Sequence, residues 1–156
     1  MDQAVAGYEL PLLLFAGFRR LIDDLHTRLA EQGHPDVRPA HGFVLQAITS
    51  QGATAAEVGR RLGVSKQAAG KTIDRLEALG YVSRTADPGD ARRRTVRVTD
   101  RGRELLRLSA SVFDALRAAW SQQLGPTAVD QLEASLRKIL GAGAFRLDTV
   151  GWLGSV

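Results

Sequence analysis

The sequence predicts a mainly α-helical protein with one small β-hairpin. Six segments repeat their apolar residues at helical spacing, and one pair of short segments alternates apolar and polar residues around turn-forming residues. Two of the helical segments are separated by only about three residues, which is typical of a helix-turn-helix, and the hairpin that follows would be its wing. The predicted fold class is therefore α+β, a winged helix-turn-helix with a helical dimerisation region.

The first predicted helix covers residues 8–33. Its apolar residues recur at steps of three and four, and further apolar positions make the stripe wider than a helix at the edge of a small domain needs. Gly33 and Pro35 would end it. The stripe consists of Leu10, Leu13, Leu14, Phe18, Leu21, Ile22, Leu25 and Leu29.

Two shorter helices are expected next. Pro39 suits the first turn of a helix that would end at residues 51–52. Thr54 and Glu57 have the spacing of a capping box, which predicts the start of the following helix. Gly63 would close that helix, two residues before the next cap.

A fourth helix and the hairpin follow. The helix would begin at the cap Ser65, run to about residue 79 and stop at Gly80. Residues 81–85 and 94–99 have the composition of two strands, and the sequence DPGD at residues 87–90 is typical of a turn. The hairpin would therefore have a long basic tip.

The last two helices extend to residue 140. Thr99 would cap the fifth helix, and the Gly-Pro pair at residues 125–126 would end it. Gly141 would end the sixth helix. The segment from Ala144 is apolar but predicts no element. The excess of apolar residues lies at the two ends of the chain. We therefore expect residues 37–99 to form the DNA-binding lobe, and residues 1–36 with 100–156 to form the dimerisation region of a homodimer.

Composition excludes several classes of protein. The chain has 156 residues and no cysteine, which rules out disulfides, zinc–thiolate sites, iron–sulfur clusters and thiol chemistry. The longest apolar run, residues 10–18, is about half of a membrane span. The acidic residues before it do not resemble a signal peptide. We expect a soluble cytoplasmic protein with no membrane association.

Positive charge is concentrated in the middle of the chain. The net charge is +4, but residues 54–107 hold thirteen Lys or Arg against seven Asp or Glu, which leaves +6 there and −2 elsewhere. Eighteen of the 21 basic residues are arginine, whose planar guanidinium pairs well with phosphate and guanine. A high-GC genome would also enrich arginine, so composition alone leaves both explanations open.

The fourth helix is the predicted recognition helix. Lys66 and Gln67 lie at its N-terminal end, where such a helix meets base edges, and glutamine can pair with adenine while lysine reaches guanine. Ser65 and its backbone N–H suit a phosphate at the helix N-terminus. The alternative is an ordinary solvated helix face. The expected DNA contacts of this helix are Ser65, Lys66, Gln67, Lys71 and Arg75.

Three consecutive arginines, Arg92, Arg93 and Arg94, follow the hairpin turn. Because they repel one another, an anionic partner is expected, and the negative potential of a DNA minor groove attracts arginine. Asp90 would hold the guanidinium of Arg92 in position. The alternative is an edge strand that its charges protect from pairing.

These segments resemble the MarR family of bacterial transcription regulators. The resemblance rests on residues 62–67 (LGVSKQ), 74–82 (DRLEALGYV), 87–92 (DPGDAR) and 96–102 (VRVTDRG). It implies a winged-helix homodimer that represses transcription, binds double-stranded DNA with Arg92 in the minor groove and Asp90 as its partner, and often releases DNA on binding a small aromatic or phenolic effector. Ala91 departs from the family pattern, in which many members have arginine. Without cysteine, the oxidation-sensing branch is excluded.

Candidates for an effector pocket between the dimer helices and the lobe are Phe15, Phe18, Phe113 and Trp120, with plain core packing as the alternative. The three histidines lack the paired spacing of metal ligands, so no metal, cofactor or catalytic site is expected. Two other functions stay open: an architectural DNA-binding protein with little sequence preference, and a winged-helix module that binds protein. An enzyme is the remote third, since the segment GKT at residues 70–72 lacks the glycine spacing of a P-loop.

Overall fold

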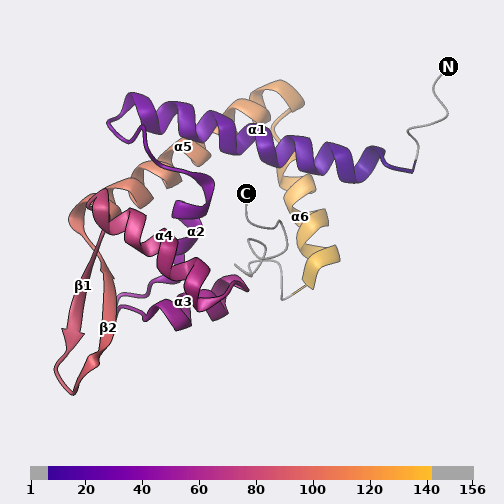
Figure 1. Ribbon diagram of the computed structural model, residues 1–156. Coiled ribbons are helices and arrows are strands. Elements are labelled where there is room, and N and C mark those ends of the chain that lie inside the picture. Colours follow the sequence, from indigo (N-terminus) through magenta and orange to yellow (C-terminus); the bar gives the residue numbers. More distant parts are fainter. Residues whose placement is uncertain (1–6, 142–156) are drawn as a thin grey trace.

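The computed structural model describes residues 7–141, and the apolar segment from Ala144 lies outside the described residues. Within that range the chain forms a helical body from which one β-hairpin projects (Figure 1). The expected order of elements and the fold class are confirmed. The elements are α1 (Glu9–Glu31), α2 (Pro39–Ala47), α3 (Ala55–Leu62), α4 (Lys66–Ala78), β1 (Val82–Asp87), β2 (Asp90–Val98), α5 (Asp100–Leu124) and α6 (Ala128–Leu140).

The helix-turn-helix is shaped by its capping residues. Thr54 Oγ1 accepts a hydrogen bond from the backbone N–H of Glu57, and Glu57 Oε2 accepts one from Thr54 N at 2.7 Å, so the predicted capping box is present. Gly63 ends α3 with φ of 66°, a left-handed conformation that favours glycine. Ser65 Oγ then accepts from Ala68 N at 3.0 Å and caps α4. These local contacts set the short turn between the two helices.

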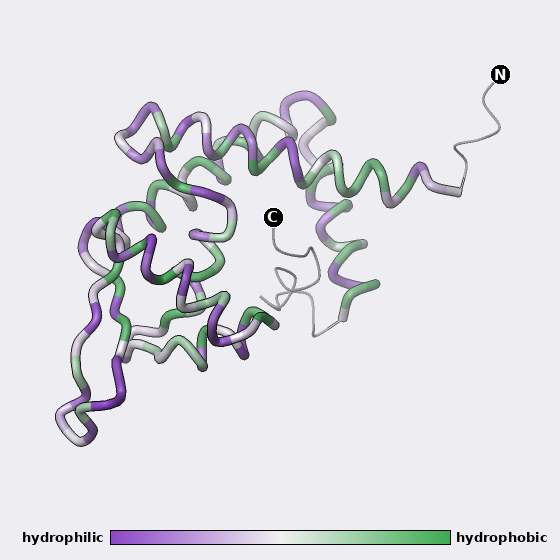
Figure 2. The backbone as a smooth tube through the Cα atoms, viewed as in Figure 1, coloured by the Kyte–Doolittle hydropathy of each residue, from purple (hydrophilic) through white to green (hydrophobic). Residues whose placement is uncertain are grey.

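One hydrophobic core joins the helix-turn-helix to α1 and α5. Leu25 and Leu29 of α1 are buried with Val58, Ile73 and Leu105 in a single cluster. The N-terminal half of α1 contributes little to it. Figure 2 shows this half as a predominantly hydrophobic stretch that extends away from the lobe. Its exposed large side chains are Leu10, Leu12, Leu13, Leu14, Phe15 and Phe18, which keep between 43% and 67% of their surface exposed.

Two expected boundaries were wrong. Helix α2 ends at Ala47 rather than at residues 51–52, because Thr49 and Gly52 form a tight turn that leads Ala53 into a bridge with Val96 of β2. The expected long basic tip is also absent from the hairpin. Strand β2 begins at Asp90 and pairs with β1 up to the turn, so the three arginines lie within the strand. Near the tip both faces of the strand are polar and exposed, and the sequence therefore lacks the alternation that marks a half-buried strand.

A buried polar contact joins the two parts of the chain. His34 follows α1, Tyr81 follows α4, and His34 Nδ1 lies 2.7 Å from the Tyr81 hydroxyl, with both side chains almost fully buried. Arg101, in the first turn of α5, places its guanidinium carbon 4.9 Å from the centre of the Tyr81 ring. The contact thus connects the ends of α1 and α4 with the start of α5.

Acidification is expected to destabilise the fold through its buried histidines. Burial, with nearby arginines, lowers the pKa of both His34 and His41 below the ordinary value. The folded state therefore disfavours the protonated form, and stability falls as the pH drops through about 6.5, where an unfolded histidine takes up a proton. His41 Nδ1 also accepts the backbone N–H of Arg38 at 3.0 Å, which requires an unprotonated nitrogen.

The measurement is the melting temperature at pH 7.5 and pH 5.5 for the wild type and for His41→Gln. Glutamine can still accept the N–H of Arg38 but does not titrate. The fall between the two pH values should be smaller in the variant. An equal fall in both proteins would show that His41 does not contribute to the pH dependence.

Candidate nucleic-acid interface

Helix α4 presents one polar face to solvent. Ala69, Ile73 and Leu76 are fully buried, which turns the opposite face outward because their spacing is helical. The expected contact residues Ser65, Lys66, Gln67, Lys71 and Arg75 are all exposed. The Ser65 side chain also caps the helix, so its hydroxyl oxygen is already engaged with Ala68 N. Figure 1 shows α3, the N-terminal end of α4 and the hairpin on the side of the molecule away from α1.

Arg84 fixes the hairpin to α4. Its Nη2 lies 2.6 Å from Asp74 Oδ1 and its Nη1 lies 3.0 Å from Glu77 Oε1. The Arg84 backbone N–H also donates to Glu77 Oε2 at 3.0 Å. The sequence motifs did not single out Arg84, although the pair Asp74 and Glu77 one helical turn apart, followed by an arginine at the start of a strand, was a signal for it. The contact orients the wing, residues 82–98, relative to the recognition helix.

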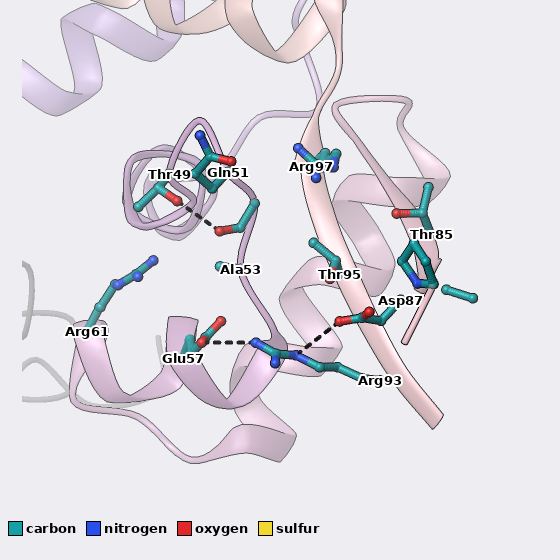
Figure 3. A pocket seen from close by; sticks show the side chains of 13 residues that line it. Thr49, Gln51, Ala53, Glu57, Arg61, Thr85, Asp87, Arg93, Thr95 and Arg97 are labelled. Carbon is teal, nitrogen blue, oxygen red and sulfur yellow. Dashed lines mark hydrogen bonds and ion pairs between the residues drawn. The ribbon is translucent and has the colours of Figure 1, made fainter. Parts of the chain in front are cut away.

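The three arginines of the wing lie on two faces of β2. Successive side chains of a strand alternate between its two faces, so Arg92 and Arg94 share one face while Arg93 lies on the other. Arg92 and Arg94 are exposed. Arg93 Nη2 lies 3.5 Å from Glu57 Oε1, and Arg93 Nε lies 3.9 Å from Asp87 Oδ2 (Figure 3). All three expected arginines are thus exposed, and Arg93 differs from the other two in its contact with Glu57 of α3.

The expected role of Asp90 is corrected by the structure. Its Oδ1 accepts a hydrogen bond from the backbone N–H of Arg92 at 2.9 Å, and among the described residues no ion pair joins Asp90 to the Arg92 guanidinium. Aspartate often binds the backbone two residues further on in a turn. Asp90 therefore shapes the turn from which the Arg92 side chain extends.

An apolar cavity of about 620 Å³ lies between α1, α2 and α5. Phe18 and Phe113 line it, with Phe43, His26 and Ser109 among the other lining residues. The other two aromatic candidates do not line it. Phe15 is exposed on the half of α1 that extends beyond the lobe. Trp120 packs towards Gly17, where a Cβ would lie 3.6 Å from its ring. Phe15 precedes the first residue of α1 that lines the cavity, Phe18, and Trp120 follows the last one of α5, Phe113.

Neither a metal-binding cluster nor a membrane-spanning helix is found among the described residues. Within residues 7–141 no group of three His, Asp or Glu side chains could hold a metal ion. No helix in the same range has both the length and the apolar character needed to cross a membrane.

Comparisons with known proteins agree with this arrangement. The model of the MarR family matches residues 36–93, which contain the helix-turn-helix and most of the wing. The LexA repressor of Deinococcus radiodurans is 31% identical over 121 residues, which are 75% of this chain and 55% of that protein. The chain therefore spans about half the length of that curated relative.

Solved structures resemble nearly the whole chain. CouR from Rhodococcus jostii RHA1, bound to p-coumaroyl-CoA, gives a TM-score of 0.63 at 25% identity, covering 92% of this chain and 96% of CouR. A mutant MarR from E. coli in complex with operator DNA gives a TM-score of 0.68 at 24% identity, covering 90% of this chain and all of that one. The family model therefore assigns residues 36–93, with the helix-turn-helix and most of the wing, to the MarR family, and the solved structures show that the described chain has the fold of MarR-type winged-helix proteins.

Proposed function

We propose that the protein is a sequence-specific DNA-binding repressor that acts as a homodimer. One observation carries the proposal: α4 presents Lys66 and Gln67 at its exposed N-terminal end, while Arg92 is exposed at the tip of a wing that Arg84 fixes to the same helix. Such a helix enters the major groove, and an arginine beyond it reaches the adjacent minor groove. The names of two relatives, a LexA repressor and a MarR protein crystallised with operator DNA, support this assignment.

The exposed apolar half of α1 supports the homodimer. Six large apolar side chains of this half are exposed, and Leu132, Ile139 and Leu140 of α6 are exposed as well. Monomeric soluble proteins rarely expose contiguous apolar patches of this kind. The dimerisation region assigned to residues 1–36 and 100–156 would use these surfaces. Light scattering at micromolar concentration should give about twice the chain mass of 16.8 kDa, and a monomer mass would contradict the dimer.

Selection of bound duplexes from a random DNA pool tests the function directly. A twofold-symmetric dimer should select a pseudo-palindrome whose half-sites lie about one helical turn apart. Bound DNA without any motif would favour the architectural alternative instead. Absence of binding would favour a module that binds protein.

Single substitutions on α4 should separate base contacts from phosphate contacts. Gln67→Ala or Lys66→Ala should weaken binding to the selected duplex by about 1–3 kcal/mol and relax the preference at one or two positions. Arg75→Ala is the matched control, because a phosphate contact carries no sequence information and its loss should weaken selected and random DNA equally. An unchanged motif with Gln67→Ala would show that another face of α4 meets the bases.

The apolar cavity supports an effector site. Its volume of about 620 Å³ is in the range of small-molecule pockets, and CouR is bound to p-coumaroyl-CoA. We infer that a small aromatic or phenolic compound binds between α1, α2 and α5, against Phe18 and Phe113, and releases DNA. A panel of phenolic acids should therefore contain a compound that raises the melting temperature and weakens DNA binding. Compounds that do neither across the panel would argue against this ligand class.

A further inference from the structure

The wing contacts the rest of the molecule at successive levels. Arg84, which binds α4, and its cross-strand partner Val96, which pairs with Ala53, lie at one level, and Arg97 lies one residue nearer the root. Arg97 Nη1 donates to the carbonyl oxygen of Ser50 at 3.5 Å. Among the hydrogen bonds and ion pairs of residues 7–141, that of Arg93 with α3 is the contact between wing and body nearest the tip. It lies one residue from Arg92.

Arg93 lines a polar cavity between the wing and α3. The cavity has a volume of about 430 Å³, and Glu57, Arg61, Asp87 and Arg93 are among its lining residues. Figure 3 shows the Arg93 guanidinium between the carboxylates of Glu57 and Asp87, each joined to it by a dashed line. The guanidinium therefore bridges the first turn of α3 and the end of β1.

Glu57 is well suited to hold Arg93. Its Oε2 accepts the N–H of Thr54 at 2.7 Å, which fixes the carboxylate and leaves Oε1 directed at Arg93. The hydrogen bonds from the backbone and side chain of Thr54 lower the pKa of Glu57, and the charge of Arg93 adds to this effect. Glu57 is therefore ionised wherever the protein is folded near neutral pH.

We propose that Arg93 is a positioning residue: its contact with Glu57 fixes the angle of the wing and so places Arg92 for the minor groove. The inference rests on the proposed DNA-binding function. Without this contact, the hairpin beyond Val96 would be a two-stranded ribbon, residues 85–87 of β1 and 90–95 of β2, with no further hydrogen bond or ion pair to the rest of the described chain. Such ribbons are marginally stable alone. Holding a mobile ribbon in one position on DNA costs conformational entropy, which weakens binding.

The competing assignment, that Arg93 itself binds a phosphate, predicts the opposite effect of one substitution. Glu57→Gln keeps the cap of α3, because glutamine also serves in a capping box, but it removes the charge that holds Arg93. If Arg93 positions the wing, Glu57→Gln should weaken binding. If Arg93 binds phosphate, removal of a competing carboxylate should strengthen binding or leave it unchanged.

The experiment measures fluorescence anisotropy on the wild-type-selected duplex for wild type, Glu57→Gln, Arg93→Gln and the double variant. We expect each single variant to weaken binding by roughly two- to tenfold, the scale of an exposed ion pair lost twice per dimer. The double variant should be no weaker than Arg93→Gln alone, because each substitution removes the same contact. The dependence on salt should change little. Glu31→Gln, at the exposed end of α1, is the matched loss of one negative charge and should leave affinity unchanged.

Hydrogen exchange of the free protein gives a second measurement that needs no DNA. Amides of residues 87–94 should exchange faster in Glu57→Gln and Arg93→Gln than in the wild type. Unchanged exchange, or stronger DNA binding by Glu57→Gln, would overturn the proposal. A DNA affinity of Arg93→Gln whose salt dependence falls by up to about two counterions per dimer would also overturn it, because Arg93 would then bind phosphate. A different outcome is that the wild type selects no duplex while exchange is still faster in both variants. That outcome would overturn the proposed function but would support the contact between Arg93 and Glu57.

Discussion

Gly102→Ala should destabilise the protein by about 3 kcal/mol or more, at the upper end of the cost of overpacking. Gly102 is buried in the first turn of α5, where the helix passes directly over the start of the wing. A Cβ at this position would lie 2.6 Å from Cγ1 of Val98 and would overlap the carbonyl oxygen of Tyr81. That carbonyl accepts the N–H of Thr99 at 3.0 Å, so it cannot move without breaking a hydrogen bond between the start of the wing and the start of α5.

Urea denaturation at fixed protein concentration measures this effect, since the stability of a dimer depends on concentration. Gly42→Ala is the matched control. Gly42 also lies inside a helix, but a Cβ there would have no neighbour within 4 Å. Alanine should therefore be neutral or stabilise by up to about 1 kcal/mol. Equal stability of Gly102→Ala and the wild type would mean that α5 starts further from Tyr81 than the structure shows.

Arg92→Ala should weaken binding to the selected duplex by about 1–3 kcal/mol, the scale of one good groove contact. The side chain is exposed beside the turn, so the melting temperature and the dimer should stay nearly unchanged. The loss should be larger where the flanking DNA is rich in A·T pairs, because a narrow minor groove concentrates negative potential. If Arg92 also neutralises a phosphate, the salt dependence should fall by up to about two counterions per dimer.

Two further variants test how specific this effect is. Asp90→Ala should produce a smaller loss of the same sign, because Asp90 holds the backbone N–H of Arg92 at 2.9 Å and so shapes the turn. Arg107→Ala removes an equal charge from an exposed position on α5 and should have little effect. Affinity of Arg92→Ala within about twofold of the wild type would show that the wing arginines only solubilise an edge strand.

Local sequence signals determined most of the fold. Thr54 with Glu57, and Ser65 alone, marked the starts of α3 and α4, because a cap is formed by residues within one helical turn. The DPGD turn located the hairpin for the same reason. The exposed contact residues of α4 followed from the 3.6-residue period, which fixes the buried face and therefore its opposite.

The tertiary structure decided what depends on distant residues. Arg84 contacts Asp74 and Glu77, and Arg93 contacts Glu57, 36 residues away. No local pattern in the three consecutive arginines distinguishes Arg93 from Arg92, because both faces of the strand near the tip are polar. Likewise, helical periodicity places Phe15 and Phe18 on similar faces of α1, but only Phe18 lies over the cavity. A period specifies the direction of a side chain, whereas the packing of other elements against it determines which partner it meets.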